Sequence, residues 1–171
     1  MYSDPEQSRR LYSEFVQSDE IRRLRLLSRV RELAGSGDAN MLNLLAWYYL
    51  NVRPKKRRTV LRSIGYCRRA IACGGVGLSS HYYLGSCLWW LDETDPDIRR
   101  HLRMASDINA EVSPDAQCDL GVAYMNGAGG AVSRRWAEYW LSKAGQSGDE
   151  LAKRNLLKLV GNRGVFKEFS G

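Results

Sequence analysis

The stretch PDAQCDLGVAYMNGAGGAVSRRWAEYWLSKAGQSG, residues 114–148, decides the fold. Small and apolar residues recur at helical spacing up to Tyr124, which places them on one helix face. Gly127, Gly129 and Gly130 then end this helix, because glycine enters left-handed backbone without a steric penalty. The apolar face of a second helix carries Trp136, Ala137, Trp140, Leu141 and Ala144. The stretch predicts two antiparallel helices, and small residues such as Gly121 should let them approach closely.

A leucine recurs every 36 residues, at Leu84, Leu120 and Leu156. The residue four positions before each leucine is small. These residues are Ser80, Ala116 and Ala152. A looser earlier copy fits Met41 and Leu45, and the sequence around Gly37-Asp38 parallels that around Gly148-Asp149. A fixed period of this length indicates stacked helical hairpins, since one hairpin cannot bury its own apolar face.

The best copy resembles the Sel1-like repeat family, which is related to the tetratricopeptide repeats. The resemblance is carried by Ala116, Leu120, Gly121, Tyr124, Gly127, Gly129, Val132, Ala137, Trp140, Lys143, Ala144 and Gly148. The copy departs from the family pattern by one extra residue before the valine and by a serine where an aspartate is expected. The second copy keeps residues 83–85 and 104–105 but has no glycines in its turn, residues 91–96. The resemblance implies a protein-binding scaffold or adaptor.

These features predict an all-α fold, a right-handed solenoid of about eight helices that forms one domain over residues 1–171. Its expected parts are N-terminal capping helices (1–38), a degenerate repeat (39–78), a repeat (79–112), the best-matching repeat (113–148), and a C-terminal capping helix with a tail (149–171). Helices are expected over 5–17, 20–33, 39–50, 60–73, 79–91, 97–109 and 149–160. A basic loop, 51–59, interrupts the degenerate repeat, since Pro54 excludes a continuous helix.

Positive charge is concentrated in the first part of the chain. The net charge is +7, and residues 1–69 hold 15 Lys and Arg against 7 Asp and Glu, a net +8. Such asymmetry bears on partners rather than on fold. A basic run with a candidate anion-binding role comprises Arg53, Lys55, Lys56, Arg57, Arg58 and Arg62. The run is either a solvated loop or a contact for nucleic acid or another polyanion, although no base-reading motif accompanies it.

Catalytic chemistry has little support in the sequence. His81 and His101 have no nucleophile or carboxylate at motif spacing, and no cofactor or metal motif is present. The four cysteines are expected to be buried free thiols. No apolar run reaches the length of about 20 residues that a membrane-spanning helix needs. We therefore expect a cytoplasmic protein that is not an enzyme, with no cofactor, no metal and no membrane partner.

Another protein is the expected partner, held in a concave groove lined by the first helix of each hairpin. The groove residues on this register are Asn43, Trp47, Tyr82, Ser86, Trp89, Trp90, Val122, Asn126, Arg154 and Lys158. Neighbouring residues on a helix point about 100° apart, so Trp89 and Trp90 can rarely both be buried. Exposed Trp and Tyr favour protein interfaces. The expected function is that of an adaptor or an inhibitor, including an immunity-type neutraliser of a cognate protein; the alternative is nucleic-acid or polyanion binding.

Overall fold

The computed structural model describes residues 4–74, 78–107 and 114–161. The regular structure in these ranges is entirely helical and comprises nine helices. Their bounds are α1 (Pro5–Gln17), α2 (Glu20–Gly35), α3 (Ala39–Asn51), α4 (Arg57–Ala72), α5 (Leu78–Leu91), α6 (Asp97–Asp107), α7 (Pro114–Asn126), α8 (Arg134–Gln146) and α9 (Glu150–Gly161). The predicted all-α class is confirmed, with one helix more than the expected number of about eight.

Most helix bounds agree with the sequence pattern, and α4 is the main exception. It begins at Arg57 rather than at residue 60, so Arg57 and Arg58 of the predicted basic loop are helical. The backbone N–H of Lys56 donates to the Thr59 hydroxyl (3.2 Å), which satisfies one of the N–H groups at this helix start. The irregular part of the basic loop is therefore shorter than predicted. The expected end of the helix over 97–109 and the C-terminal tail lie outside the described residues.

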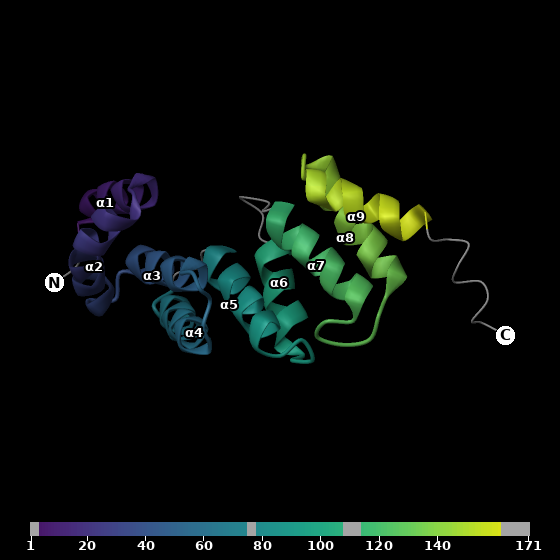
Figure 1. The fold of residues 1–171 in the computed structure, drawn as a ribbon, viewed down its shortest axis with the longest axis horizontal. Helices are drawn as coiled ribbons and strands as arrows, with labels where there is room; N and C mark the ends of the chain where they lie inside the picture. The colour runs from purple at the N-terminus through teal and green to yellow at the C-terminus, as the bar shows by residue number, and fades with distance from the viewer. Residues whose placement is uncertain (1–3, 75–77, 108–113, 162–171) are drawn as a thin grey trace. The chain divides into compact units, whose positions relative to one another are not determined.

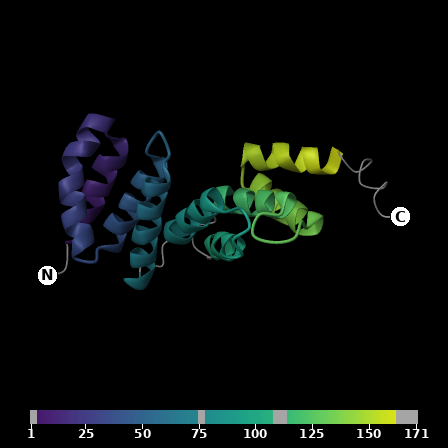
Figure 2. The same cartoon turned by 60° about the horizontal axis from the view of Figure 1, so that its bottom comes forward.

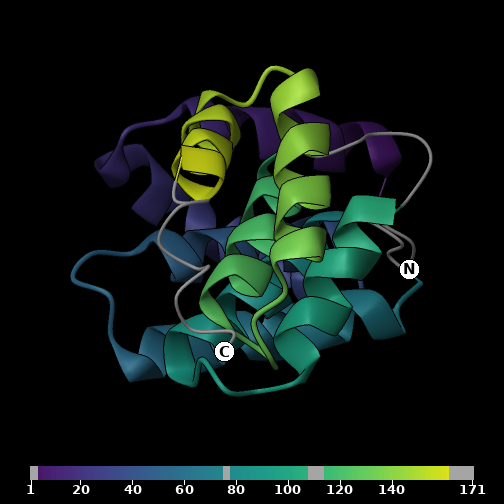
Figure 3. The same cartoon turned by 90° about the vertical axis from the view of Figure 1, so that its right-hand side faces the viewer.

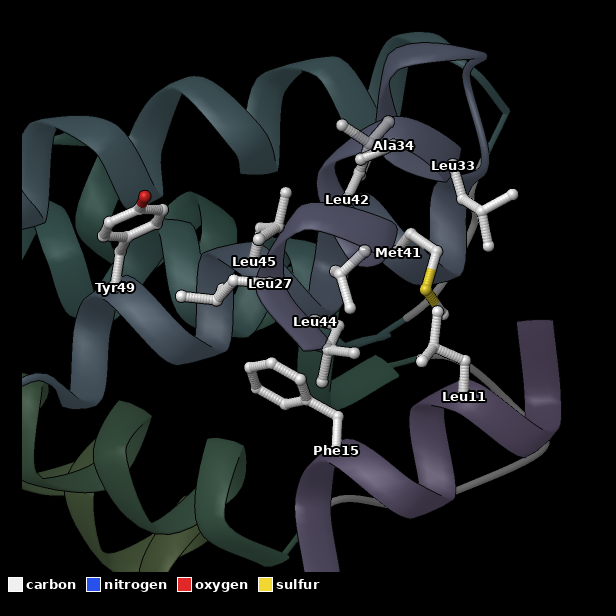
Figure 4. Packing of buried hydrophobic residues seen from close by; sticks show 12 residues of the cluster. Leu11, Phe15, Leu27, Leu33, Ala34, Met41, Leu42, Leu44, Leu45 and Tyr49 are labelled. Atoms are coloured by element: carbon white, nitrogen blue, oxygen red, sulfur yellow. The ribbon is translucent and has the colours of Figure 1, made fainter. Parts of the chain in front are cut away.

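The chain forms two compact units, Met1–Cys87 and Leu88–Gly171, with the boundary inside α5. In the first unit α1 packs against α2 and α3, and α3 packs against α4. Figure 2 shows α1 and α2 side by side in this unit. A buried apolar cluster holds these helices together through side chains such as Phe15, Leu27, Met41 and Leu45 (Figure 4).

Part of the predicted apolar face of α2 is exposed. Leu27, Val30 and Leu33 are buried, but Ile21 is 66% exposed and Leu24 is 56% exposed. The buried positions run from Leu27, near the middle of the helix, toward its C-terminal end, where α2 contributes to the cluster of Figure 4. The sequence pattern correctly predicts which face of the helix is apolar. It does not predict how much of that face a neighbouring helix buries.

The turns between successive hairpins recur with the same geometry. Gly37 and Gly148 both have positive φ, +89° and +97°. The aspartate that follows each glycine begins the next helix: Asp38 accepts a hydrogen bond from the backbone N–H of Met41 (3.1 Å), and Asp149 accepts one from that of Ala152 (2.8 Å). The predicted parallel between these two turns is confirmed.

In the second unit α7 and α8 pack closely, and α8 also packs against α9 (Figure 3). A Cβ atom on Gly121 would lie only 2.7 Å from Cγ of Leu141, so the helix approach depends on this glycine. The leucine register has a consistent core role: Leu84 and Leu120 are buried, and Leu156 packs against a buried cluster. The small residue four positions before each of them is completely buried.

The glycine-rich turn between α7 and α8 fits against the turn that precedes α6 (Figure 1). The backbone N–H of Gly129 donates to the Glu93 carbonyl (2.8 Å), and Gly129 has φ +69°. The Arg99 guanidinium donates to the carbonyls of Ala123 (3.1 Å) and Gly130 (2.9 Å) and lies 4.3 Å from the Tyr124 ring centroid. These contacts join consecutive hairpins of the second unit.

Candidate binding surfaces

The predicted groove residues of the first unit are half-buried, and two of them have internal hydrogen-bond roles. The Ser80 hydroxyl donates to the amide oxygen of Asn43, which joins α5 to α3. The hydroxyl of Ser86 donates to the Tyr82 carbonyl (3.0 Å) within α5. Asn43 and Ser86 therefore use polar groups inside the fold.

Trp47 is also tied to its own unit. The Arg23 guanidinium lies 5.4 Å from the Trp47 ring centroid, within the range of a cation–π contact. The indole is half-buried against the core cluster of the first unit. Part of this ring therefore supports the fold, and only its remaining surface is available to a partner.

The predicted groove residues of the second unit range from half-buried to exposed. Trp90 is 44% exposed, while Trp89 is half-buried, as the neighbouring positions on one helix require. Val122 packs against the cluster of Cys118, Leu141 and Ala144, so it is largely a core residue. The remaining three residues are exposed. They are Asn126, Arg154 and Lys158. The groove as one continuous surface stays a prediction, because its residues are divided between the two units.

The basic run of residues 53–62 is open to solvent and carries no ion pair within the described residues. Five of its six cations are exposed, and Lys55 is half-buried. Burial lowers the pKa of Lys55, and the neighbouring positive charge of Arg53 lowers it further. Arg53 and Lys55 are thus close enough to repel each other.

One member of that run, Arg62, lies in a pocket of the first unit that the sequence does not predict as a site. The pocket has a volume of about 570 Å³ and is lined by Arg31, Tyr49, Arg62, Gly65, Tyr66 and Arg69. The lining contains three arginines and no carboxylate. Helices α2, α3 and α4 all contribute to it, so this cationic pocket forms only when the three helices pack together.

The two tyrosines form the aromatic wall of the pocket. The Tyr49 and Tyr66 rings are stacked, with centroids 5.6 Å apart and planes 6° apart. Tyr49 lies at the edge of the core cluster, and its hydroxyl oxygen points away from Phe15 (Figure 4). This hydroxyl accepts a hydrogen bond from the Arg31 guanidinium (2.9 Å), which raises the pKa of Arg31.

The other two arginines are held differently. The guanidinium carbon of Arg62 lies 5.4 Å from the Tyr49 ring centroid. Arg69 donates to the Ala34 carbonyl (3.0 Å), one of the last carbonyls of α2. Arg62 and Arg69 are seven residues apart on α4 and therefore share a helix face, a signal present in the sequence. The contribution of Arg31 comes from a separate helix and requires the tertiary fold.

One residue of the predicted apolar face of α8 is largely accessible. Trp140 is buried as predicted, but Trp136 is 41% exposed, and Tyr139, which lies outside the predicted face, is 51% exposed. The rings form a connected row: the Trp136 centroid lies 6.1 Å from that of Tyr124 and 5.8 Å from that of Tyr139. The Lys143 ammonium lies 5.2 Å from the Trp140 ring. The second unit thus presents an exposed aromatic row on α8, a helix outside the predicted groove.

The cysteine prediction holds for three of the four thiols. Cys67, Cys87 and Cys118 are buried and free, whereas Cys73 is exposed and free. Cys73 follows the last residue of α4, so it lies beyond the apolar face of that helix. No cluster of three or more His, Cys, Asp or Glu side chains suited to a metal occurs in the part of the chain that the structure describes. None of the described helices combines the length and the apolar character needed to cross a bilayer.

Several solved structures resemble this fold, including the two that follow. One is a protective antigen of uropathogenic Escherichia coli strains that displays an SLR fold: it is 23% identical, the match covers 80% of this chain and 28% of the antigen, and the TM-score is 0.66. The other is a Sel1 repeat protein from Oxalobacter formigenes: it is 27% identical, the match covers 77% of this chain and 97% of that chain, and the TM-score is 0.55. The chain thus spans little more than a quarter of the antigen.

No protein-family model and no curated protein matches the sequence. The assignment therefore depends on the structure: hairpins in a 36-residue register, recurring glycine–aspartate turns and the two structural neighbours. The fold is typical of protein-interaction repeat modules and of non-catalytic scaffolds. The fold of this chain is the one seen in Sel1-like repeat proteins.

Proposed function

We propose that this chain is a non-catalytic module that binds another protein, and that it acts as an adaptor or as an inhibitor of that partner. The observation that carries the proposal is the exposure of Trp90, which is 44% accessible although tryptophan is a large apolar residue. Trp and Tyr are enriched among the residues that dominate interface energies. Together with the repeat fold, an accessible tryptophan on a first-helix face supports recognition of a protein surface.

The surroundings of Trp90 support the same role. Trp89, its neighbour on α5, is half-buried and can hold the helix in place while Trp90 projects to solvent. On α9, a helix that among the described residues contacts α7 and α8 rather than α5, exposed Arg154 and Lys158 offer charged groups of the kind found at interface rims. Inhibition of a cognate protein, including immunity-type neutralisation, is one form of this function, since a small repeat scaffold can cover a partner's active surface. The free thiols fit a reducing compartment such as the cytoplasm.

Site-specific photo-crosslinking in the native host tests this function. A benzophenone amino acid at position 90 should capture a discrete protein partner, because the side chain there contacts the bound surface. The same probe at position 146, an exposed residue at the end of α8, provides the matched control. Trp90→Ala should reduce co-purification of the captured partner while leaving helical content unchanged. Equal crosslinking from both positions, or no crosslinked protein from position 90, would contradict the proposal.

A second candidate function is polyanion binding through the basic run of residues 53–62, which is exposed and without ion pairs in the described residues. Lys and Arg that neutralise nucleic-acid phosphates give an affinity that falls steeply with salt. Mobility shifts with random-sequence DNA and RNA over a salt series test it. The absence of a shift at low salt excludes it.

A further inference from the structure

We propose that the cationic pocket between α2, α3 and α4 is a binding site for a phosphomonoester group, presented by a phosphorylated side chain of a partner protein. The pocket brings Arg31, Arg62 and Arg69 to one place and contains no carboxylate that could neutralise them. The assignment to a protein segment rests on the proposed protein-binding function, whereas the anion chemistry stands without it.

The first step of the argument is the number of unused donors. A guanidinium carries five N–H groups in a rigid fork. Arg31 donates to the Tyr49 hydroxyl and Arg69 donates to the Ala34 carbonyl, so each keeps further N–H groups for a ligand. Arg62 is exposed and has no hydrogen-bond acceptor in the described protein. Three like charges without a carboxylate repel one another, and an anion relieves that repulsion.

The second step distinguishes a phosphomonoester from a carboxylate. A carboxylate carries one negative charge and two oxygens, which suit a single bidentate arginine. A phosphomonoester carries about −1.5 to −2 charges at pH 7 and three terminal oxygens. It can therefore accept hydrogen bonds from several guanidinium groups at once and compensate more of their charge. A pocket of about 570 Å³ has room for such a group together with the side chain that bears it.

The third step concerns the walls of the pocket. The Tyr49 ring is buried, and it is occupied by the stacked Tyr66 ring and by the Arg62 guanidinium. It therefore offers no free face for a nucleobase, although base stacking is the usual contribution of aromatic residues in single-stranded nucleic-acid sites. Its role here is to orient two arginines, one through the hydroxyl and one through the ring. This arrangement favours a phosphate on a protein side chain over a nucleic acid.

The fourth step concerns Gly65, which lies between the arginines on α4. A Cβ atom at this position would meet nothing within 4 Å, so the missing side chain opens space in the pocket. Glycine inside a helix costs about 0.5–1 kcal/mol relative to alanine. A residue that destabilises the helix therefore occupies a position that lines the pocket.

NMR titration of the whole chain tests the site, with N-acetyl-phosphoserine amide as the probe. The probe should shift the Nε–Hε signals of Arg31, Arg62 and Arg69 saturably. Arg62→Ala should weaken binding about 10-fold or more, because it removes charge-assisted hydrogen bonds. Arg68→Ala removes the same charge from an exposed neighbour outside the pocket and should change the affinity less than about 2-fold. Gly65→Leu should fill the pocket and weaken binding without loss of helical content.

Further probes separate the sources of the anion. N-acetyl-glutamate amide and a DNA oligonucleotide without terminal phosphate should each bind more weakly than the phosphoserine probe. Equal binding of either one overturns the phosphomonoester assignment, and equal binding of inorganic phosphate overturns the protein source. Equal losses in Arg62→Ala and Arg68→Ala indicate diffuse attraction and overturn the site. These failures are distinguishable from failure of the proposed function, because crosslinking from position 90 probes the other unit.

Discussion

Both units place an arginine against a tyrosine ring, but the two arginines are used differently. In the second unit the Arg99 guanidinium lies 4.3 Å from the Tyr124 centroid and donates to two backbone carbonyls. In the first unit Arg62 lies 5.4 Å from the Tyr49 centroid and is exposed. The two arginines differ in how many of their guanidinium N–H groups donate hydrogen bonds to the protein.

That difference separates a structural arginine from one that is available to a ligand. Arg99 is half-buried, and burial lowers its pKa. Its two acceptors lie at the end of α7 and in the turn that follows, so it fixes the glycine-rich turn against the preceding hairpin. Arg62 makes no such link and leaves its charge uncompensated. Residue type and aromatic neighbour are the same in both places, whereas burial and hydrogen bonding to the protein distinguish the roles.

The largest expected effect follows directly from this contrast. Arg99→Ala should lower the free energy of unfolding by about 2–4 kcal/mol, since it leaves two carbonyls without their charged donor and removes a cation–π contact. Arg62→Ala should lower it by less than about 1 kcal/mol, because the Arg62 side chain is exposed and donates no hydrogen bond to the described part of the protein. Urea denaturation measures both.

Two further variants of the second unit sharpen that measurement. Arg100→Ala, at an exposed neighbour of Arg99, controls for the loss of charge. Arg99→Lys should fail to restore stability, because an ammonium cannot reproduce the fork of N–H groups. If Arg62→Ala destabilised the protein as much as Arg99→Ala, the distinction between structural and available arginines would be wrong.

A second comparison uses two helical glycines, one in each unit. Gly121→Ala should destabilise the protein by about 1–3 kcal/mol, because its Cβ would lie 2.7 Å from Leu141 Cγ and force the α7–α8 contact apart. Gly65→Ala should stabilise it by about 0.5–1 kcal/mol, because the same methyl group enters open space and alanine favours the helix. Thermal and urea unfolding of both variants, measured in parallel, provide the test. Changes of the same sign would contradict the structure at one of these glycines.

The sequence predicted the helices of both units well, because their signals are local. Apolar spacing, the glycines with positive φ at 37 and 148, and the aspartates that follow them each act over a few residues. The close approach at Gly121 was also predictable, since only a small residue serves there. The early start of α4 was missed because the Lys56–Thr59 cap involves a lysine, a residue type that rarely marks a helix start.

The binding surfaces were less predictable, because exposure is a tertiary property. Periodicity places Trp136 and Trp140 on one apolar face, yet only Trp140 is buried, since the neighbouring helices cover that part of the face alone. The pocket around Arg62 requires Arg31, which lies on a different helix 31 residues earlier. No local pattern connects two such positions without knowledge of how the helices pack.

A smaller stability effect is expected at Gln117 in the second unit. Its side chain is fully buried, and its amide nitrogen and oxygen have no hydrogen-bond partner within the described residues. Gln117→Met keeps a similar shape without the polar groups and should raise the free energy of unfolding by about 1 kcal/mol. Urea denaturation measures the change, and Asn126→Met, at an exposed position of the same helix, is the matched control. A destabilised Gln117→Met variant would mean that this amide has hydrogen-bond partners in solution.

The smallest effect at neutral pH concerns the thiols, whose ionisation should not change the free energy of unfolding there. Burial raises the pKa of Cys67 in the first unit and of Cys118 in the second to about 12. At pH 8 both remain protonated, and only exposed Cys73 should react with a thiol reagent in the native protein. Above the ordinary thiol pKa of 9.0 the unfolded chain releases protons that the folded chain retains, so the free energy of unfolding should fall between pH 9 and about 12. Cys73→Ala should keep this slope, whereas the Cys67→Ala/Cys118→Ala double variant should make it shallower; equal slopes would show that these two thiols do not carry the alkaline instability.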